Sequence, residues 1–498
     1  MCQSDRFRFE EPSGPYGVGL KVVEQYDHSR VFRYCRDGLG DPYLGECARP
    51  LQTLIWYPAE RSEREHMTVG DYGNLCATET HFGKPKMSAN AKEFLSGMKA
   101  ALSVPLRAVK DALIVEGRFP VVIYAPSFSA PSWENADLCE YFASHGYLVL
   151  ATPSVGVVTR NMTSDLAGIN AQARDISYLI GYAAKLENSD MSQVCVVGFS
   201  WGGIANVFAA SQDSRIKALI VLDGSLRFSP GIVRQAGHVH PDEMSIPLLS
   251  IAQGQWTREE QDRQGTDNDR SGPNVLNAWT HGDLIAIYML AMAHGEFASM
   301  YQRNEHAWRD VFKPWHQKKA GYDREDAAAG YAWMARYALQ FLNAYLKNDR
   351  SGLSFLRRTP AQNGVPRHVM ATDFRAAVGV PASFDGFREE LGRRGFENAG
   401  EIYSSLQKKK PGFELDEELL ISWSEELMED QHLVQAIILL ELNARTHENS
   451  SRAYATLGYA YQQSRRNEQA VNCYRTALEK DSDNIEAKRR LWQLQGVS

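Results

Sequence analysis

Three side chains in this sequence have the types and the chain order of a nucleophile, an acid and a base. Ser200 stands in the stretch Gly-Phe-Ser-Trp-Gly, Asp223 comes later, and His281 comes later still. In such a set the imidazole removes the proton of the hydroxyl group, and the carboxylate fixes the tautomer of the imidazole. The chemistry that these residues predict is attack of Ser200 on a carbonyl carbon.

The residues around Ser200 predict a tight corner between a buried strand and a helix. Residues 194–197 are an apolar run rich in valine, as expected for a central parallel strand, and a helix is expected over residues 201–210. A serine at this corner is strained, and its neighbours collide unless the residues two positions away on each side are very small. Gly198 and Gly202 meet that requirement. The simpler alternative is a serine that only begins a helix.

Two backbone N–H groups are predicted to bind the negative oxygen that forms during the attack. Residues 119–124 predict a strand that ends shortly before Phe128, and Trp201 directly follows the serine. Because chemistry in α/β sheets gathers where strands end, the N–H groups of Phe128 and Trp201 are the predicted donors.

The acid is predicted from the next buried strand. Residues 216–222 form an apolar run that ends in Asp223. One helix and one strand fit between Ser200 and this carboxylate, so both are expected at the same edge of the sheet. The following strand, expected over residues 247–252, is succeeded by glutamines rather than by a carboxylate, which favours Asp223. A plain helix cap is the alternative role of this aspartate.

The base is predicted to be His281. It lies late in the chain, directly before an apolar helix expected over residues 284–293, and it keeps the order Ser, Asp, His. His294, His306 and His316 are rivals that lie further on.

The N-terminal part is expected to open a larger sheet with two antiparallel strands, residues 17–26 and 51–57. Residues 61–117 then interrupt the succession of strands with amphipathic helical patterns. They are expected to form a lid or an insertion that walls a pocket, or simply to pack over a sheet edge. Tryptophans near the predicted strand ends are expected to line an apolar pocket or to lie in the core: Trp133, Trp201, Trp256 and Trp279.

The composition is that of a soluble globular protein with more than one domain. The chain has 498 residues, of which 44% are hydrophobic and 23% charged, and its net charge is −7. Basic residues are neither in excess nor clustered, so no nucleic-acid partner is expected. The seven cysteines form no Cys-x-x-Cys pair and no Cys/His cluster, so neither a metal nor another cofactor is expected. A disulfide between Cys35 and Cys47 is one option.

No segment predicts a membrane span. The longest apolar run, residues 284–293, falls well short of the ~20 residues that a spanning helix needs. The N-terminus has neither the basic region nor the apolar core of a signal peptide. The compartment is left open: periplasmic or secreted if a signal peptide has been removed, and cytoplasmic otherwise.

The sequence resembles the α/β-hydrolases, in particular the platelet-activating-factor acetylhydrolases and the dienelactone-hydrolase-like esterases. The resemblance covers roughly residues 15–350, although Pro126-Ser127 stands where the family has a His-Gly pair. It implies an α/β-hydrolase fold, with a mostly parallel central sheet and helices on both faces, in a catalytic domain over residues 1–350. The residues that carry it are Gly198-Phe199-Ser200-Trp201-Gly202-Gly203, Leu222-Asp223-Gly224 and Thr280-His281.

Beyond about residue 350 the strand signals disappear. A linker over residues 351–385 is expected to lead to a helical-repeat domain over residues 386–498. Ala436 and Ala470 are separated by 34 residues, the period of the tetratricopeptide repeat. Such a module is expected to bind a protein partner, to self-associate or to cover part of the hydrolase. Residues 451–484 resemble one such repeat through Tyr454, Leu457, Gly458, Tyr461, Ala470, Tyr474, Ala477, Leu478 and Asn484.

These features predict a serine hydrolase that cleaves a small-molecule carboxylic ester through an acyl-enzyme, without a cofactor. Two alternatives stay open. One is an inactive hydrolase-fold scaffold whose helical tail binds a protein partner, and the other is an amidase or acyltransferase that uses the same three residues.

Overall fold

The chain divides into two compact units, residues 1–377 and 378–498, each with its own apolar core. A computed structural model describes residues 7–34, 36, 39–224, 226, 230–254, 274–318 and 321–496. No helix in this described part of the chain is both long and apolar enough to cross a membrane. Of the two cysteines for which a disulfide was an option, Cys47 is a free thiol and Cys35 lies outside the described residues, as does Trp256.

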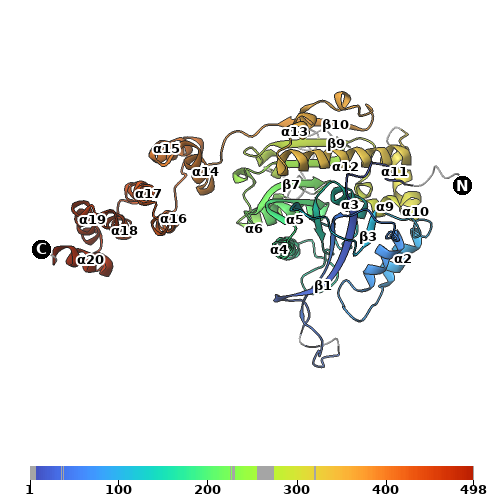
Figure 1. The fold of residues 1–498 in the computed structure, drawn as a ribbon, viewed down its shortest axis with the longest axis horizontal. Coiled ribbons are helices and arrows are strands. Elements are labelled where there is room, and N and C mark those ends of the chain that lie inside the picture. The colour runs from blue at the N-terminus through green and yellow to red at the C-terminus, as the bar shows by residue number, and fades with distance from the viewer. Residues whose placement is uncertain are drawn as a thin grey trace. The chain divides into compact units, whose positions relative to one another are not determined.

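Among the described residues of the first unit, ten strands form one sheet in the order β10-β9-β8-β7-β6-β4-β5-β2-β1-β3 (Figure 1). The six strands from β9 to β5 run parallel to one another, β2 pairs antiparallel with β5 and β1, β10 pairs antiparallel with β9, and β3 pairs parallel with β1. The predicted antiparallel opening pair is therefore confirmed. The strands are β1 (Gly17–Val31), β2 (Ala48–Ala59), β3 (Ala108–Lys110), β4 (Phe119–Ala125), β5 (Leu148–Ala151), β6 (Ser189–Phe199), β7 (Ile216–Leu222), β8 (Leu248–Gln253), β9 (Leu284–Met289) and β10 (Met370–Arg375).

Helices cover both faces of the sheet, because the central strands carry apolar residues on both sides, as in the run 194–197 of β6 and the run 218–222 of β7, and must bury both. Along β4, Val121 and Ile123 belong to one core and Val122 and Tyr124 to the other, as the two-residue period of a strand requires. The first core is closed by α4 (Leu166–Ala183) and α5 (Trp201–Ala210), and the second by α3 (Ala136–Ser144) and α12 (Arg324–Leu346).

The remaining elements of the first unit are short and lie mostly in the insertion and in the connections after β7 and β9. They are α1 (Val69–Asn74), η2 (Leu75–Ala77), α2 (Ala89–Gly97), α6 (Pro230–Ala236), η3 (Pro241–Glu243), α8 (Val275–Ala278), η4 (His294–Phe297), α9 (Ser299–Gln302), α10 (Glu305–Ala307), η5 (Trp308–Phe312), α11 (Lys313–Lys318), α13 (Arg350–Arg357) and η6 (Pro360–Asn363).

Two sequence-based expectations about elements are wrong. The apolar residues after position 283 form the strand β9, not a helix, because a short apolar run fits a buried strand as well as a buried helix. Residues 351–385 are not a linker as a whole: α13 and β10 belong to the first unit, and β10 extends the sheet by pairing with β9. The unit boundary lies between Ala377 and Val378.

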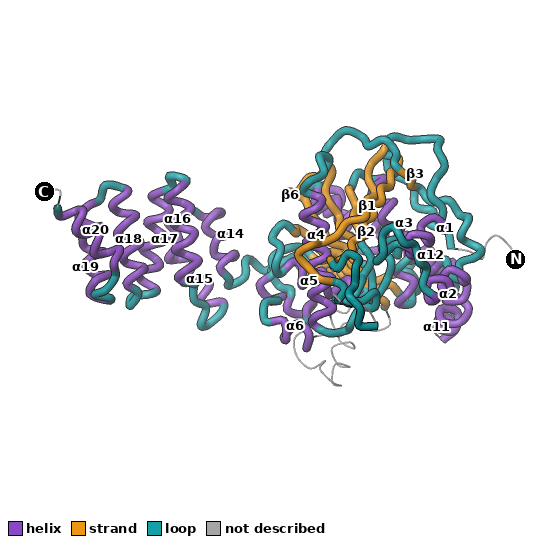
Figure 2. Tube along the Cα trace, turned by 90° about the horizontal axis from the view of Figure 1, so that it is seen from below, coloured by secondary structure: helices purple, strands orange, loops and turns teal. Residues whose placement is uncertain are grey.

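The second unit consists of antiparallel helices that follow one another along the chain (Figure 2). Ala436 and Ala470, the two alanines with the 34-residue spacing, are both fully buried. Gly458 allows close packing, since a Cβ atom there would lie 2.7 Å from the ring of Tyr474. The helices are α14 (Phe384–Arg394), η7 (Phe396–Asn398), α15 (Ala399–Lys409), α16 (Glu417–Glu429), α17 (Leu433–Thr446), α18 (Ser451–Gln463), α19 (Asn467–Lys480) and α20 (Ile485–Gln495).

Candidate active site

Ser200 occupies the predicted corner between β6 and α5. Its backbone has φ 53° and ψ −115°, a region that a non-glycine residue enters only under strain. A Cβ atom at Gly198 would lie 2.3 Å from the carbonyl oxygen of Gly202, and one at Gly202 would lie 2.1 Å from that of Ala125. Both glycines are therefore required by close backbone approach, which holds the hydroxyl group of Ser200 at the carboxyl edge of the sheet.

We expect Gly202→Ala to destabilise the protein and to lower its activity, because the new methyl group meets backbone atoms of the neighbouring strand that cannot turn away. Overpacking of this kind costs about 1–3 kcal/mol in the free energy of unfolding, measurable by urea titration. Gly181→Ala is the matched control. It lies in α4, where an added Cβ meets nothing within 4 Å. That variant should be as stable as the wild type or slightly more stable. Equal loss in both variants would contradict the explanation.

Ser200, His294 and Asp223 form a continuous hydrogen-bonded chain. The Nε2 atom of His294 lies 2.9 Å from Oγ of Ser200, and its Nδ1 atom lies 2.6 Å from Oδ2 of Asp223. The carboxylate accepts a hydrogen bond from the N–H group at Nδ1, so Nε2 carries no proton and can accept that of the serine hydroxyl. The carboxylate is held in turn by Gln253, whose backbone N–H and side-chain amide donate to it at 2.9 and 3.2 Å.

The histidine of this chain is His294 and not His281, so the sequence-based choice of base is wrong. The cause is the misread element between the two residues. Since 284–289 form the strand β9, His281 precedes that strand and His294 follows it. β9 runs parallel to β8 and β7, and through them to β6, so His281 lies at the opposite edge of the sheet from Ser200. A strand reading of the apolar run would have favoured His294.

The other two rivals lie away from this chain. His316 is buried, and its Nε2 atom lies 2.9 Å from a carboxylate oxygen of Glu296, which makes it part of the support for the segment after β9. His306 is exposed on α10. Asp223 was predicted correctly to lie beside Ser200, and the glutamine that follows β8 supports this carboxylate instead of replacing it.

The two predicted oxyanion donors lie next to one another. Trp201 is the first residue of α5, and Phe128 lies in the loop after β4. Their rings meet edge to face with centroids 5.7 Å apart, and the Phe128 ring is partly exposed. In the part of the chain that the structure describes, neither backbone N–H donates to another backbone carbonyl. Both N–H groups are thus available to a ligand atom.

The charge around His294 favours its protonated form. Desolvation lowers the pKa of His294, but the hydrogen bond and the negative charge of Asp223, helped by the charge of Glu134, outweigh this and raise the pKa above its ordinary value of 6.5. An imidazolium that forms when the serine loses its proton is therefore stabilised.

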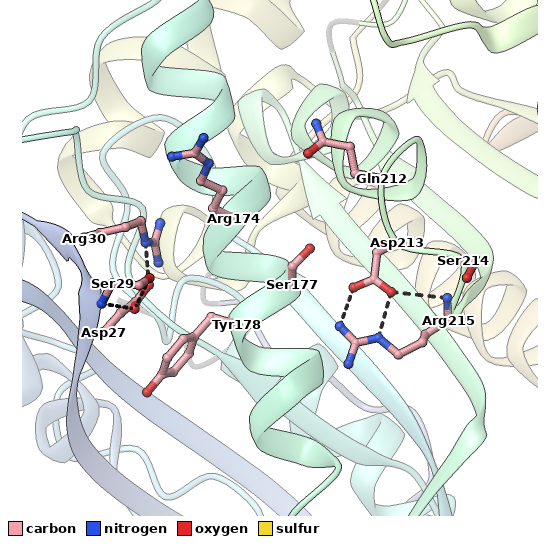
Figure 3. Close-up of a pocket in the computed structure, with 10 residues that line it drawn as sticks. All are labelled: Asp27, Ser29, Arg30, Arg174, Ser177, Tyr178, Gln212, Asp213, Ser214 and Arg215. Carbon is pink, nitrogen blue, oxygen red and sulfur yellow. Dashed lines mark hydrogen bonds and ion pairs between the residues drawn. The ribbon is translucent and has the colours of Figure 1, made fainter. Parts of the chain in front are cut away.

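One cavity on the first unit, of about 730 Å³, lies beside α4 and β1, and its lining includes three arginines and two aspartates (Figure 3). Arg30 pairs with Asp27 at 2.5 Å, and Arg215 with Asp213 at 2.6 Å. Another cavity, of about 600 Å³, lies between the insertion and the loop that follows Phe128.

The described residues contain no group of three or more His, Cys, Asp and Glu side chains arranged to hold a metal ion.

The insertion over residues 61–117 contributes a wall to the cavity of about 600 Å³, and through β3 it also extends the sheet edge. Trp133 lines that cavity, whereas Trp279 is buried in the core and donates to the carbonyl of Ile246.

Comparisons with known proteins find similarity to a hydrolase family and to a solved esterase structure. A sequence model of the family described as X-Pro dipeptidyl-peptidase (S15 family) matches residues 78–324. Among solved structures, a ferulic acid esterase from Streptomyces cinnamoneus is similar, with 19% sequence identity and a TM-score of 0.52. That match covers 74% of this chain and 98% of the esterase chain. No curated protein matches the sequence. The first unit has the α/β-hydrolase fold.

Proposed function

We propose that this chain is a serine hydrolase that cleaves carboxylic esters, with Ser200 as nucleophile, His294 as base and Asp223 as acid. The observation that carries the proposal is the hydrogen-bonded chain of these three side chains at the carboxyl edge of a parallel sheet. The matched peptidase family and the similar esterase support hydrolysis of an acyl compound. The strained corner that presents Ser200 supports its role as nucleophile.

In the proposed reaction, Oγ of Ser200 attacks the carbonyl carbon while His294 takes its proton. The carbonyl oxygen becomes negative and is bound by the N–H groups of Phe128 and Trp201. His294 then protonates the leaving alcohol, and the acyl group stays on Ser200. Water attacks this ester with His294 again as base, which releases the acid and restores the enzyme. Asp223 keeps the imidazole in the required tautomer throughout.

A fluorophosphonate probe tests this assignment on the full-length protein. Because the probe reacts with an activated serine, we expect one label per chain, located on Ser200 by peptide mass spectrometry. The label should be lost when the protein is unfolded beforehand. The absence of a label, or a label on another serine, would contradict the proposal and favour the inactive scaffold.

Amide hydrolysis is the second candidate, because the matched family is one of X-Pro dipeptidyl-peptidases. The same three residues can serve both reactions, so the substrates must decide. We expect higher kcat/KM for 4-nitrophenyl acetate than for an alanyl-prolyl 4-nitroanilide. A ratio in favour of the anilide would assign the chain to the peptidases.

Addition of an alcohol as acceptor tests acyl transfer, which would produce a new ester instead of the acid.

Activity should fall as the pH is lowered through the pKa of His294. His294 must be neutral to accept the proton of Ser200, and its pKa is raised above 6.5. The active fraction is therefore present above that pKa and is lost below it. We expect kcat/KM, measured from about pH 5 to about pH 9, to rise to a plateau with a midpoint above 6.5. A midpoint clearly below 6.5 would show that the charges of Asp223 and Glu134 do not act on the base as described.

We also propose a finer family assignment for the first unit and a binding role for the second. Resemblance to the platelet-activating-factor acetylhydrolase and dienelactone-hydrolase branch rests on the Ser200 and Asp223 motifs, since Thr280-His281 lies at the other edge of the sheet. We infer that the second unit is a tetratricopeptide-like module that binds a protein partner or a second copy of the chain, from its buried alanines at the repeat period. Sedimentation of the full chain over a range of concentrations tests self-association.

A further inference from the structure

The cavity beside the insertion lies next to the proposed oxyanion loop. Ser129 and Ala130, which directly follow Phe128, form part of its lining, and Tyr301, from the segment after β9, lines it as well. The cavity therefore lies beside both loops that carry the proposed active-site groups. Its volume of about 600 Å³ is in the range of small-molecule sites.

One wall of this cavity is apolar and aromatic. Phe94 of α2 and Tyr301 of α9 pack edge to face with centroids 5.4 Å apart. Trp133 is held by a hydrogen bond from its indole N–H to the sulfur of Cys76. Flat, fixed rings of this kind bind an aromatic or branched hydrocarbon body. The apolar side chains of the lining are Leu95, Phe94, Trp133, Met300 and Tyr301.

The lining also carries excess positive charge. Its cations include Lys86 and Arg160, and its one carboxylate, Glu79, pairs with Arg160 at 2.7 Å. Lys86 therefore has no carboxylate partner among the residues that line the cavity. His81 also lines the cavity. Desolvation lowers the pKa of its imidazole, and the positive charges of Arg33, Lys86 and Lys84 lower that pKa further.

We propose that this cavity binds an ester substrate with an aromatic or branched apolar body and a carboxylate group, the carboxylate facing Lys86. The proposal rests on the proposed esterase function and names its substrate class. A neutral ester would leave the excess positive charge without a partner, whereas a carboxylate neutralises it.

A matched pair of aryl esters tests the substrate class. The 4-nitrophenyl ester of terephthalic acid carries a free carboxylate, and the corresponding ester of 4-carbamoylbenzoic acid is its neutral counterpart of equal shape. We expect the wild type to prefer the carboxylate ester in kcat/KM by about fivefold at low salt, and the preference to shrink as salt screens the charges. Lys86→Gln should remove most of the preference.

Lys99→Gln is the control, because Lys99 is an exposed lysine of the same insertion that is not part of the lining. It should keep the preference. A wild-type ratio of one or less, or an unchanged ratio in Lys86→Gln, overturns the proposal. Cleavage of 4-nitrophenyl acetate without cleavage of either benzoate ester overturns it too, while the esterase function stands. If no ester is cleaved at all, the proposed function fails, and this proposal fails with it.

A second inference concerns Glu134, whose fully buried carboxyl group contacts the residue that precedes Phe128 in the proposed oxyanion loop. It accepts hydrogen bonds from the backbone N–H of Ser127 at 2.8 Å, from the hydroxyl of Ser127, and from the hydroxyl of Tyr124 at 3.1 Å. Ser127 directly precedes Phe128, so this carboxyl group fixes the start of the loop that carries one proposed oxyanion donor.

The same short segment also holds the loop that carries the base. The backbone carbonyl of Glu134 accepts the N–H of Met300 at 3.2 Å. The side chain of Asn135 donates to the carbonyl of Phe297 at 3.0 Å and accepts the N–H of Ser299 at 3.1 Å. Phe297 ends η4, the turn that begins with His294. Residues 134 and 135 thus bind both loops at once.

We propose that Glu134 is a positioning residue that holds the oxyanion loop and the His294 loop in register and supplies negative charge to the imidazolium. It is fully buried, so it does not touch substrate. The titratable groups that face it are Tyr124 on β4, His294 on η4, Tyr301 on α9 and Cys139 on α3.

Glu140→Gln provides a matched control for Glu134→Gln. Glu140 lies in α3, is equally buried, and accepts a tyrosine hydroxyl at 2.6 Å and a backbone N–H at 2.5 Å. Burial raises the pKa of both carboxyl groups to about 7. The two substitutions therefore impose similar changes in the core, but only one touches the active-site loops.

We expect Glu134→Gln to lower kcat by roughly 10- to 100-fold with KM nearly unchanged, because a displaced oxyanion donor weakens binding of the transition state and not of the substrate. The midpoint of the acidic limb should also move modestly to lower pH, since His294 loses a neighbour that is partly ionised at that pH, the pKa of Glu134 being about 7. Glu140→Gln should change neither quantity.

Equal effects of the two substitutions, or an unchanged midpoint in Glu134→Gln, overturn the positioning role. If Glu134→Gln does not fold, Ser127→Ala decides the question, because it removes one hydrogen-bond donor to the same carboxyl group and leaves that carboxyl group itself in place. A severalfold loss in kcat at constant KM supports the role, and unchanged kcat overturns it.

Discussion

Replacement of His294 by glutamine is expected to lower kcat/KM for 4-nitrophenyl acetate by about 10⁴- to 10⁶-fold, the loss seen when the base of a serine triad is removed. His294 alone joins the hydroxyl of Ser200 to the carboxylate of Asp223, with hydrogen bonds of 2.9 and 2.6 Å. A glutamine side chain can fill part of the space but cannot take and return a proton. The serine hydroxyl then stays a weak nucleophile, and fluorophosphonate labelling should be lost as well.

His281→Gln is the matched control, since it removes the other histidine with a place in the order Ser, Asp, His. It lies before β9, at the opposite edge of the sheet, and should leave kcat/KM within about twofold of the wild type. Loss of activity in a folded His281→Gln protein, together with an active His294→Gln protein, would contradict the assignment of His294 as the base. Circular dichroism establishes that both variants are folded.

Replacement of Asp223 by asparagine is expected to lower kcat by about 10³- to 10⁴-fold while KM changes little. Asparagine has the shape of aspartate, but its amide N–H₂ group can turn toward Nδ1 of His294 and donate. Nδ1 must then be the acceptor, and the proton moves to Nε2, the atom that faces Ser200. In that tautomer the imidazole cannot accept the proton of the hydroxyl group. The backbone N–H of Gln253, which donates to Oδ1 of Asp223, can donate to the amide oxygen in the same way, so the substitution should change the chemistry more than the fold.

Asp213→Asn is a suitable control for this loss. Both carboxylates are mostly buried, but Asp213 pairs with Arg215 in the cavity beside α4, away from Ser200 and His294. It should reduce stability modestly and leave kcat unchanged. Activity in Asp223→Asn near that of the wild type would show that another carboxyl group orients the base.

The sequence was most informative where a local pattern has one structural solution. An apolar strand followed by Gly-x-Ser-x-Gly leaves little choice, because larger residues at Gly198 and Gly202 would strike backbone atoms. The same holds for the strand that ends in Asp223, since parallel strands separated by one helix expose their ends at one edge. The helical character of the C-terminal unit was also readable, from a repeat whose alanines are buried.

The sequence could not decide which histidine joins this pair. The residues from Leu284 onward are apolar enough for either a buried helix or a buried strand, and that choice alone determines at which edge of the sheet His281 and His294 emerge. Pairing with β8 and β10 decides it, and both partners are distant in sequence. Likewise, nothing near Glu134 in the sequence marks it as a support for two loops.

By itself, then, the sequence determined the positions of the proposed nucleophile and its acid, the mostly parallel sheet and the helical tail, because short-range sterics and the periodicity of apolar residues act within a few residues of the chain. The tertiary structure alone decided the base, the extent of the sheet through β10 and the charge of the substrate cavity. Each of these depends on contacts between segments far apart in the chain, and such contacts leave no local trace in the order of residues.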